Sequence, residues 1–237
     1  MTTIRFHTEE KWVDAIPKPE KANKFFPKWF KKIKSHIEDN PSKGTVKRCV
    51  PFIDALSLGY IIPMWSDCWI HVDGDQINFE FPEHYPFGES LGSHSYEQIK
   101  DYNLSNTAFG KMPFKWMNPW IIETDLGYSC LFTSPLNHLE NRFKILDGVV
   151  DTESYYNNIN FPFIWTEGNG SYFIEKGMPL VQVIPFKRDN YTASVGSIDV
   201  LKNTNTIASL NSNIKDGYRK EFSKTWEKKR GEDEELS

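Results

Sequence analysis

The sequence predicts a mainly β fold with some helix (α+β), organised as a β-sandwich or a jelly-roll-like barrel. Short β-branched and aromatic segments recur in the second half of the chain, and Gly, Pro and Asn separate them at intervals of about 8–12 residues. These segments are "PWIIET", "YSCLFTSP", "FKILDGVVDT", "FPFIWT", "SYFIEKG" and "PLVQVIPFKR". A hydrophobic content of 39% and an aromatic content of 15% supply enough apolar side chains for a core.

A strand and a basic helix are predicted at the start of the chain. The opening "MTTIRF" has the alternation of a short strand, and seven lysines then fall between Lys18 and Lys34. Pro27 suits the first turn of a helix, and we predict an amphipathic helix over residues 27–38. Its apolar positions are Trp29, Phe30, Ile33 and Ile37. We expect these residues to dock on the sheet and the lysines to face solvent, although such helices also bind membranes or partner proteins.

A β-hairpin is predicted at "WIHVDGDQINFEF", residues 69–81. The run Asp73-Gly74-Asp75 has the composition of a tight turn between two strands. Alternation places Ile77, Phe79 and Phe81 on one face of the second strand. We expect Trp69 to be among the packing residues of the first strand.

The chain is expected to have three regions. Residues 1–45 hold the first strand and the basic helix, packed on a β-sandwich core of residues 46–190. Residues 191–237 hold a polar connection, a C-terminal helix and an acidic tail. The helix is predicted because Tyr218, Phe222 and Trp226 follow one another at spacings of four residues, which gives an amphipathic helix one aromatic stripe.

Composition narrows the class of protein. The net charge is −4, so bulk electrostatic attraction to nucleic acid is not expected. The three cysteines, Cys49, Cys68 and Cys130, are scattered, which suits neither a zinc site nor a disulfide framework and fits a reducing compartment. No signal peptide and no apolar run of about 18 residues is evident, so a cytoplasmic protein without a transmembrane segment is predicted.

One candidate metal site begins at the predicted hairpin. His71 and Asp73 lie two residues apart and would share one face of a strand. With a second histidine, His138, they would form the two-histidine, one-carboxylate set that holds Fe(II) in oxygenases. Arg142 or Arg188 would then bind the carboxylate of 2-oxoglutarate. This reading is the alternative one, because a turn follows Asp73 at once and no motif surrounds His138; the preferred reading has no cofactor.

Other catalytic patterns are weaker. The chain has no G-x-S-x-G elbow and no phosphate-binding glycine loop. The pairs Asp73/Asp75 and Asp147/Asp151 lie beside Gly or Thr and are interpreted as turn formers. A ligand groove is the preferred hypothesis, because aromatic residues lie near turn residues where they would line a groove for a sugar, a peptide or a planar ligand. The candidate binding residues are Trp116, Trp120, Trp165 and Arg188.

Several ordered blocks resemble one uncharacterised family, which carries a domain-of-unknown-function label and has bacterial and tailed-phage members, many of them in marine phages. The blocks are "RCVPFIDALSLGYIIPMWSD", "PWIIETDLGYSCLFTSPLN", "LDGVVDT" and "EKGMPLVQVIPFKR". The resemblance spans about Ile16 to Arg188 and implies no chemistry. The last block also resembles the late strand, G-x-x-x-x-Q, of trimeric nucleotide-hydrolysing β-barrels. The phosphate-binding Ser and Arg motifs of those enzymes are absent, so this second likeness implies a fold only.

The sequence therefore predicts a phage-type accessory protein with a β-domain that binds a small molecule, a glycan or a protein, and with no demonstrable catalytic set. Its partner is unknown, and homo-oligomers are compatible with the pattern. One alternative is an oxygenase that uses Fe(II) and 2-oxoglutarate. The other is a structural or assembly component of a virion.

Overall fold

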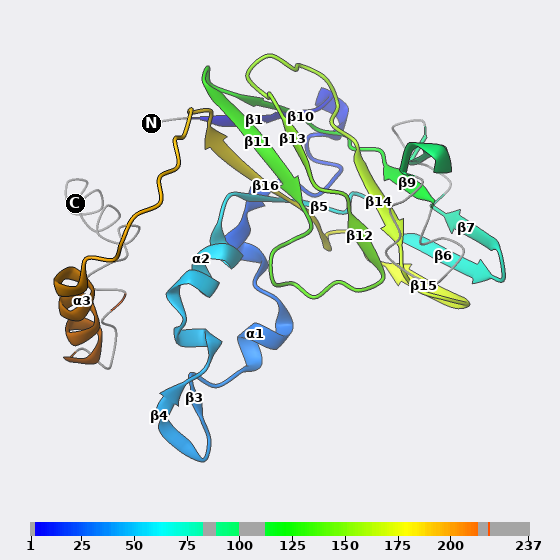
Figure 1. Cartoon of the computed structure of the whole chain (residues 1–237). Helices are drawn as coiled ribbons and strands as arrows, with labels where there is room; N and C mark the ends of the chain where they lie inside the picture. Colours follow the sequence, from blue (N-terminus) through cyan, green and yellow to red (C-terminus); the bar gives the residue numbers. More distant parts are fainter. Residues whose placement is uncertain (1–2, 83–88, 100–111, 213–217, 219–237) are drawn as a thin grey trace. The chain divides into compact units, whose positions relative to one another are not determined.

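The computed structural model describes residues 3–82, 89–99, 112–212 and 218 (Figure 1). The chain divides into two compact units, one of residues 1–32 and 55–189 and the other of residues 33–54 and 190–237. Residues 33–54 thus belong to the second unit. The predicted regions, 1–45, 46–190 and 191–237, stay a prediction.

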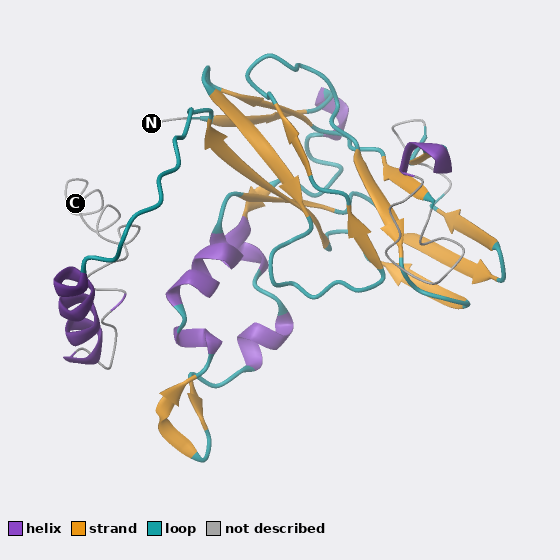
Figure 2. Cartoon of the chain, in the orientation of Figure 1, coloured by secondary structure: helices purple, strands orange, loops and turns teal. Residues whose placement is uncertain are grey.

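The fold is mainly β, as predicted, and Figure 2 shows that strands are the main regular elements of the first unit. Every strand pair among the residues described is antiparallel. A five-stranded sheet has the order β13-β11-β16-β5-β2, a four-stranded sheet β12-β14-β9-β8 and a three-stranded sheet β15-β6-β7. Two further pairs are β1-β10 and β3-β4.

The strands have the following bounds: β1 Ile4–His7, β2 Glu20–Lys21, β3 His36–Ile37, β4 Asn40–Gly44, β5 Tyr60–Pro63, β6 Cys68–Asp73, β7 Gln76–Glu80, β8 Leu91–Ser93, β9 Pro113–Trp116, β10 Ile121–Thr124, β11 Tyr128–Thr133, β12 Phe143–Ile145, β13 Gly148–Val150, β14 Phe161–Trp165, β15 Gly170–Ile174 and β16 Pro179–Lys187. The α-helices are α1 Lys28–Lys32, α2 Val50–Ser57 and α3 Val200–Ser212. Short 3-10 turns cover Glu10–Trp12, Ala22–Phe25, Val46–Arg48 and Tyr96–Ile99.

The helical predictions need correction. The basic helix extends over Lys28–Lys32 only, because His36–Ile37 pairs with Asn40–Gly44 as a small hairpin. The predicted polar connection contains α3, Val200–Ser212. The predicted C-terminal helix falls, apart from Tyr218, outside the residues that the structure describes.

The core of the first unit lies between its sheets. Val181 and Val183 of β16 belong to the same buried cluster as Phe161 and Phe163 of β14. The rings of Phe132 and Phe161, from the five-stranded and four-stranded sheets, are 5.9 Å apart. Burial of such rings removes large apolar areas from water and supplies most of the stabilisation of a sandwich.

The hairpin of residues 69–81 is confirmed. Strands β6 and β7 pair in register from Trp69↔Glu80 to Asp73↔Gln76, and Gly74 takes the left-handed φ of 56° that the turn requires. Trp69 was expected in the core, but its side chain lies on the outer side of β6 and is 49% exposed.

The G-x-x-x-x-Q block has a structural role. Gly177 turns the chain into β16 with a φ of 87°. Gln182, only 1% exposed, donates from Nε2 to the carbonyl oxygens of Ala55 and Leu58, at 3.1 and 2.6 Å. Its Oε1 accepts a hydrogen bond from the backbone N–H of Leu136 at 2.8 Å. Gln182 thus joins β16 to the C-terminal end of α2 and to the connection after β11, and it satisfies backbone groups in both.

Candidate functional site

The three predicted groove tryptophans lie in the core. Trp116, Trp120 and Trp165 are 0%, 3% and 0% exposed. Trp116 stacks on Phe163 with ring centroids 4.4 Å apart. Side chains with so little accessible surface cannot line an open groove, so the groove prediction is wrong for these residues.

The predicted metal ligands do not form a site. His71 Nδ1 lies 2.9 Å from Ser171 Oγ, and its Nε2 lies 3.7 Å from Glu80. Burial lowers the pKa of His138. Among the residues that the structure describes, no group of three or more His, Cys, Asp or Glu side chains could hold a metal ion. Arg142, a candidate for 2-oxoglutarate, is bound to Glu140 instead, at 2.6 Å.

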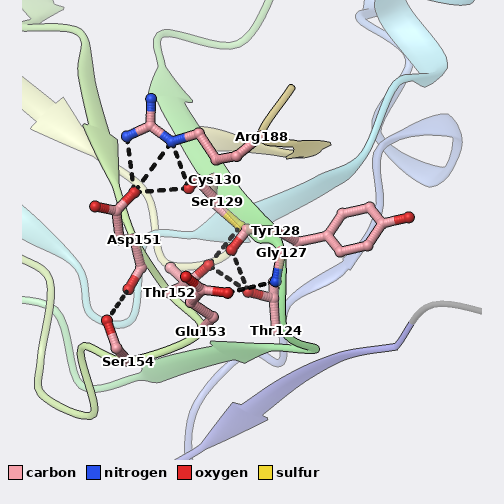
Figure 3. Close-up of polar contacts among 10 residues, drawn as sticks. All are labelled: Thr124, Gly127, Tyr128, Ser129, Cys130, Asp151, Thr152, Glu153, Ser154 and Arg188. Carbon is pink, nitrogen blue, oxygen red and sulfur yellow. Dashed lines mark hydrogen bonds and ion pairs between the residues drawn. The ribbon is translucent and has the colours of Figure 1, made fainter. Parts of the chain in front are cut away.

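A polar cluster lies where three adjacent strands of the five-stranded sheet end or begin (Figure 3). Ser129 is on β11, Asp151 follows β13 and Arg188 follows β16. The order β13-β11-β16 brings these positions together although they are far apart in sequence. The backbone N–H of Arg188 also donates to Gly127 O at 2.9 Å. This hydrogen bond continues the pairing of β11 with β16 as far as the cluster.

The three side chains converge on one carboxylate oxygen. Asp151 Oδ1 accepts from Ser129 Oγ at 2.7 Å and from Arg188 Nη2 and Nε at 2.8 and 3.2 Å. The hydrogen bonds of Arg188, followed by that of Ser129, lower the pKa of Asp151. In Figure 3, Asp151 Oδ2 and Arg188 Nη1 point away from these contacts. The cluster therefore presents an anionic acceptor beside a cationic donor.

The residue after Asp151 is fixed from inside the protein. Thr152 is 1% exposed, and its hydroxyl lies 2.7 Å from that of buried Thr124 and 3.4 Å from Cys130 Sγ. Thr124 Oγ1 also donates to Tyr128 O at 3.0 Å. Burial raises the pKa of Cys130 to about 11, so its sulfur stays protonated. These contacts hold the backbone of Asp151 in place.

A groove of ≈ 710 Å³ lies further along the same connection. The carbonyl oxygen of Asp151 accepts from the N–H groups of Ser154 and Tyr155, at 3.1 and 3.0 Å. Tyr155 and Tyr156 then line the groove, together with His7, Glu89, Asn118 and Asn160. Tyr156 is 65% exposed, and its ring centroid is 5.7 Å from that of His7. The groove thus offers exposed aromatic rings beside amide groups.

Arg188 was predicted as a binding residue and lies in the cluster. The interpretation of Asp151 as a turn former misses the ion pair of its carboxylate with Arg188. The local signal at "VVDTES" is indeed that of a turn, because Asp151 O accepts hydrogen bonds there. Its partner Arg188 is 37 residues away, and only the strand order reveals the pair.

No family model matches this chain, and no curated protein matches it. Similar solved structures are those of phage dUTPases. A mutant dUTPase of Staphylococcus bacteriophage 80alpha with dUpNHpp is 12% identical, with 83% of this chain and 97% of that chain covered and a TM-score of 0.38. The dUTPase of phage phi11 of S. aureus is 12% identical, with 83% and 96% covered and a TM-score of 0.37.

These comparisons contradict the predicted function. The phage dUTPases named above are enzymes, rather than accessory binding proteins without a catalytic set, oxygenases or virion components. With 12–13% identity and TM-scores below 0.5, they do not assign dUTPase activity to this chain. Separately, no helix in the described part of the chain is long and apolar enough to cross a membrane.

Proposed function

We propose that this chain hydrolyses a phosphoanhydride bond of a nucleotide at the cluster of Ser129, Asp151 and Arg188. The observation that carries the proposal is the pairing of an ionised carboxylate with a guanidinium at an exposed sheet end. Their side chains are 57% and 55% exposed, so a ligand can reach both. Phosphoryl transfer depends mainly on positioning and on charge stabilisation, and these two groups can supply both.

Asp151 is proposed to orient the attacking water. Its Oδ1 is occupied by Ser129 and Arg188, while Oδ2 points away from these contacts in Figure 3 and can accept a hydrogen bond from water. A carboxylate that is held ionised keeps this acceptor available over a wide pH range. Because Ser129 donates to Oδ1, its role is to position the carboxylate.

Arg188 is proposed to bind the phosphate. Its Nη2 and Nε hold Asp151, and its Nη1 points away from Asp151 in Figure 3. A guanidinium keeps its charge at any relevant pH and donates along fixed directions to phosphate oxygens. Charge that builds up on these oxygens in the transition state would be stabilised by it.

The groove at Tyr155 and Tyr156 is proposed to receive the nucleoside. Exposed rings stack on planar bases, and neighbouring amide groups can hydrogen-bond to base edges. The hydrogen bonds from Ser154 and Tyr155 to Asp151 O link this groove to the cluster.

A panel of nucleoside triphosphates tests the proposal, and dUTP is the first choice because the similar solved structures are dUTPases. Release of pyrophosphate and phosphate would be measured by chromatography for the full chain. Asp151→Asn should abolish turnover, and Arg188→Gln should reduce it strongly. Asp147→Asn, at an exposed acid before the same strand, is the matched control and should keep wild-type activity. Absence of hydrolysis across the panel, or full activity of Asp151→Asn, would refute the assignment.

We also propose membership of the uncharacterised bacterial and tailed-phage family and a cytoplasmic location in an infected cell. The ordered blocks between Ile16 and Arg188 support the membership. An alignment of chains that carry these blocks should keep Gly59, Gln182 and Asp151, since the first two maintain the fold and the third the cluster. Frequent replacement of Asp151 in that alignment would show that the family as a whole does not share the proposed chemistry.

A further inference from the structure

The sheet β15-β6-β7 has one buried and one exposed side. Ile70 and Val72 of β6 point into the core, whereas the alternate residues Trp69, His71 and Asp73 point outward. We use the name "aromatic face" for the outward side chains Trp69, His71, Asp73, Glu80 and Phe173. Two large rings lie on it, with Trp69 49% and Phe173 38% exposed. Contiguous exposed apolar side chains are a common feature of interaction surfaces.

The rings of this face form an ordered group. The centroids of Trp69 and Phe173 are 4.7 Å apart, and the rings of Trp69 and His71 are nearly parallel, at 9°. The strand register places Phe173 opposite Trp69 and Trp69 opposite Glu80, so these three side chains form one row across the sheet. An aromatic surface is therefore flanked directly by a carboxylate.

The charge on the aromatic face is negative. Glu80 accepts from Asn78 at 3.0 Å and lies 3.7 Å from His71. Neither Glu80 nor Asp73 forms an ion pair with a lysine or an arginine in the part of the chain that the structure describes. A cationic partner therefore complements this surface, and the phosphates of a nucleic acid would be repelled by it.

The complementary charge is present on α1. Lys28 and Lys32 are exposed, and neither has an ion-pair partner among the described residues. The nearby Lys18 and Lys24, by contrast, pair with Asp14 and Glu20. Figure 1 shows α1 well away from β6, β7 and β15, so the two surfaces do not meet within one chain.

We propose that the aromatic face binds α1 of a second copy of this chain. Lys28 and Lys32 are one helical turn apart, about 5–6 Å between Cβ atoms. Glu80 and Trp69 are direct cross-strand neighbours, about 5 Å apart. One lysine therefore pairs with Glu80 while the other lies over the ring of Trp69 as a cation–π contact. The contact is heterologous, so successive copies form a ring or a chain rather than a two-fold dimer.

Self-association of the full chain tests this proposal independently of any hydrolysis. Sedimentation velocity at rising protein concentration should show association that weakens at high salt. The double variant Trp69→Ala/Phe173→Ala should raise the dissociation constant about tenfold or more. Glu175→Lys, at an exposed acid just beyond β15, is the matched control and should associate as the wild type does.

Charge reversal gives the sharper test. Glu80→Lys alone and Lys28→Glu/Lys32→Glu alone should each be monomeric, because like charges then meet. A mixture of the two variants should associate again, since each contact between them joins opposite charges. A monomeric wild type at all concentrations would overturn the proposal. Variants that associate as the wild type does would also overturn the proposal. That result would mean that the contact, whether with a second copy or with another partner, uses a different surface.

Discussion

Arg188 donates from both Nη2 and Nε to one oxygen of Asp151, at 2.8 and 3.2 Å, and makes the largest contribution to keeping this carboxylate ionised. The pKa of Asp151 is lowered in the folded protein. The interaction therefore stabilises the fold above the unfolded-state pKa of about 3.9 and is lost as the pH falls through the lower folded value. In Arg188→Gln the pKa of Asp151 should rise towards its ordinary value, as measured by carbon-detected NMR titration of the carboxyl. Arg5→Gln, which removes a different ion pair with Asp125, should leave this titration unchanged.

Gly59 and Gly74 form a matched pair for backbone strain. Both have a left-handed φ, 66° and 56°, but a Cβ at Gly59 would lie 2.1 Å from Val183 O, whereas one at Gly74 meets nothing within 4 Å. Gly59→Ala should therefore lower the free energy of unfolding by about 3 kcal/mol or more, since the left-handed strain adds to a clash with backbone. Gly74→Ala should lower it by only about 1 kcal/mol. Urea denaturation measures both, and equal losses would contradict the predicted clash at β16.

The tryptophans separate into core and surface residues. Trp116 has no exposed surface, so Trp116→Ala should lower the free energy of unfolding by about 3–5 kcal/mol. Trp69 is half-exposed, and Trp69→Ala should lower it by about 1 kcal/mol or less at a protein concentration where the chain is monomeric. A large decrease in the free energy of unfolding for Trp69→Ala, with a small one for Trp116→Ala, would contradict the placement of Trp116 in the core and Trp69 on the surface.

Local features were predictable where neighbouring residues decide them. The hairpin at residues 69–81 follows from the Asp-Gly turn and the alternation on either side of it. The same alternation places Trp69 and His71 on one side but does not say which side is buried, because that depends on the sheet that covers β6. The pair of Asp151 and Arg188 depends on the strand order β13-β11-β16, and non-local pairing of this kind has no signature in either segment.

The buried hydroxyl pair of Thr124 and Thr152 predicts a measurable coupling. Their oxygens are 2.7 Å apart, and each has a further contact, with Tyr128 O and Cys130 Sγ. Each single Thr→Val change leaves the other hydroxyl without this partner and should lower the free energy of unfolding by about 1–2 kcal/mol. The double variant should lose about 1 kcal/mol less than the sum of the singles, because no hydroxyl is then left without its counterpart.

Measurement of kcat and KM for these variants shows whether the hydroxyl pair only stabilises the fold or also positions the residues of the site. Thr152 adjoins Asp151, so a shift of its backbone should move the carboxylate and lower kcat for any nucleotide that is hydrolysed, with little change in KM. Thr166→Val, which removes an exposed hydroxyl bonded to Asn141 O, is the control and should keep both constants. If Thr152→Val loses stability but keeps kcat, the hydroxyl pair maintains the sheet end without positioning Asp151.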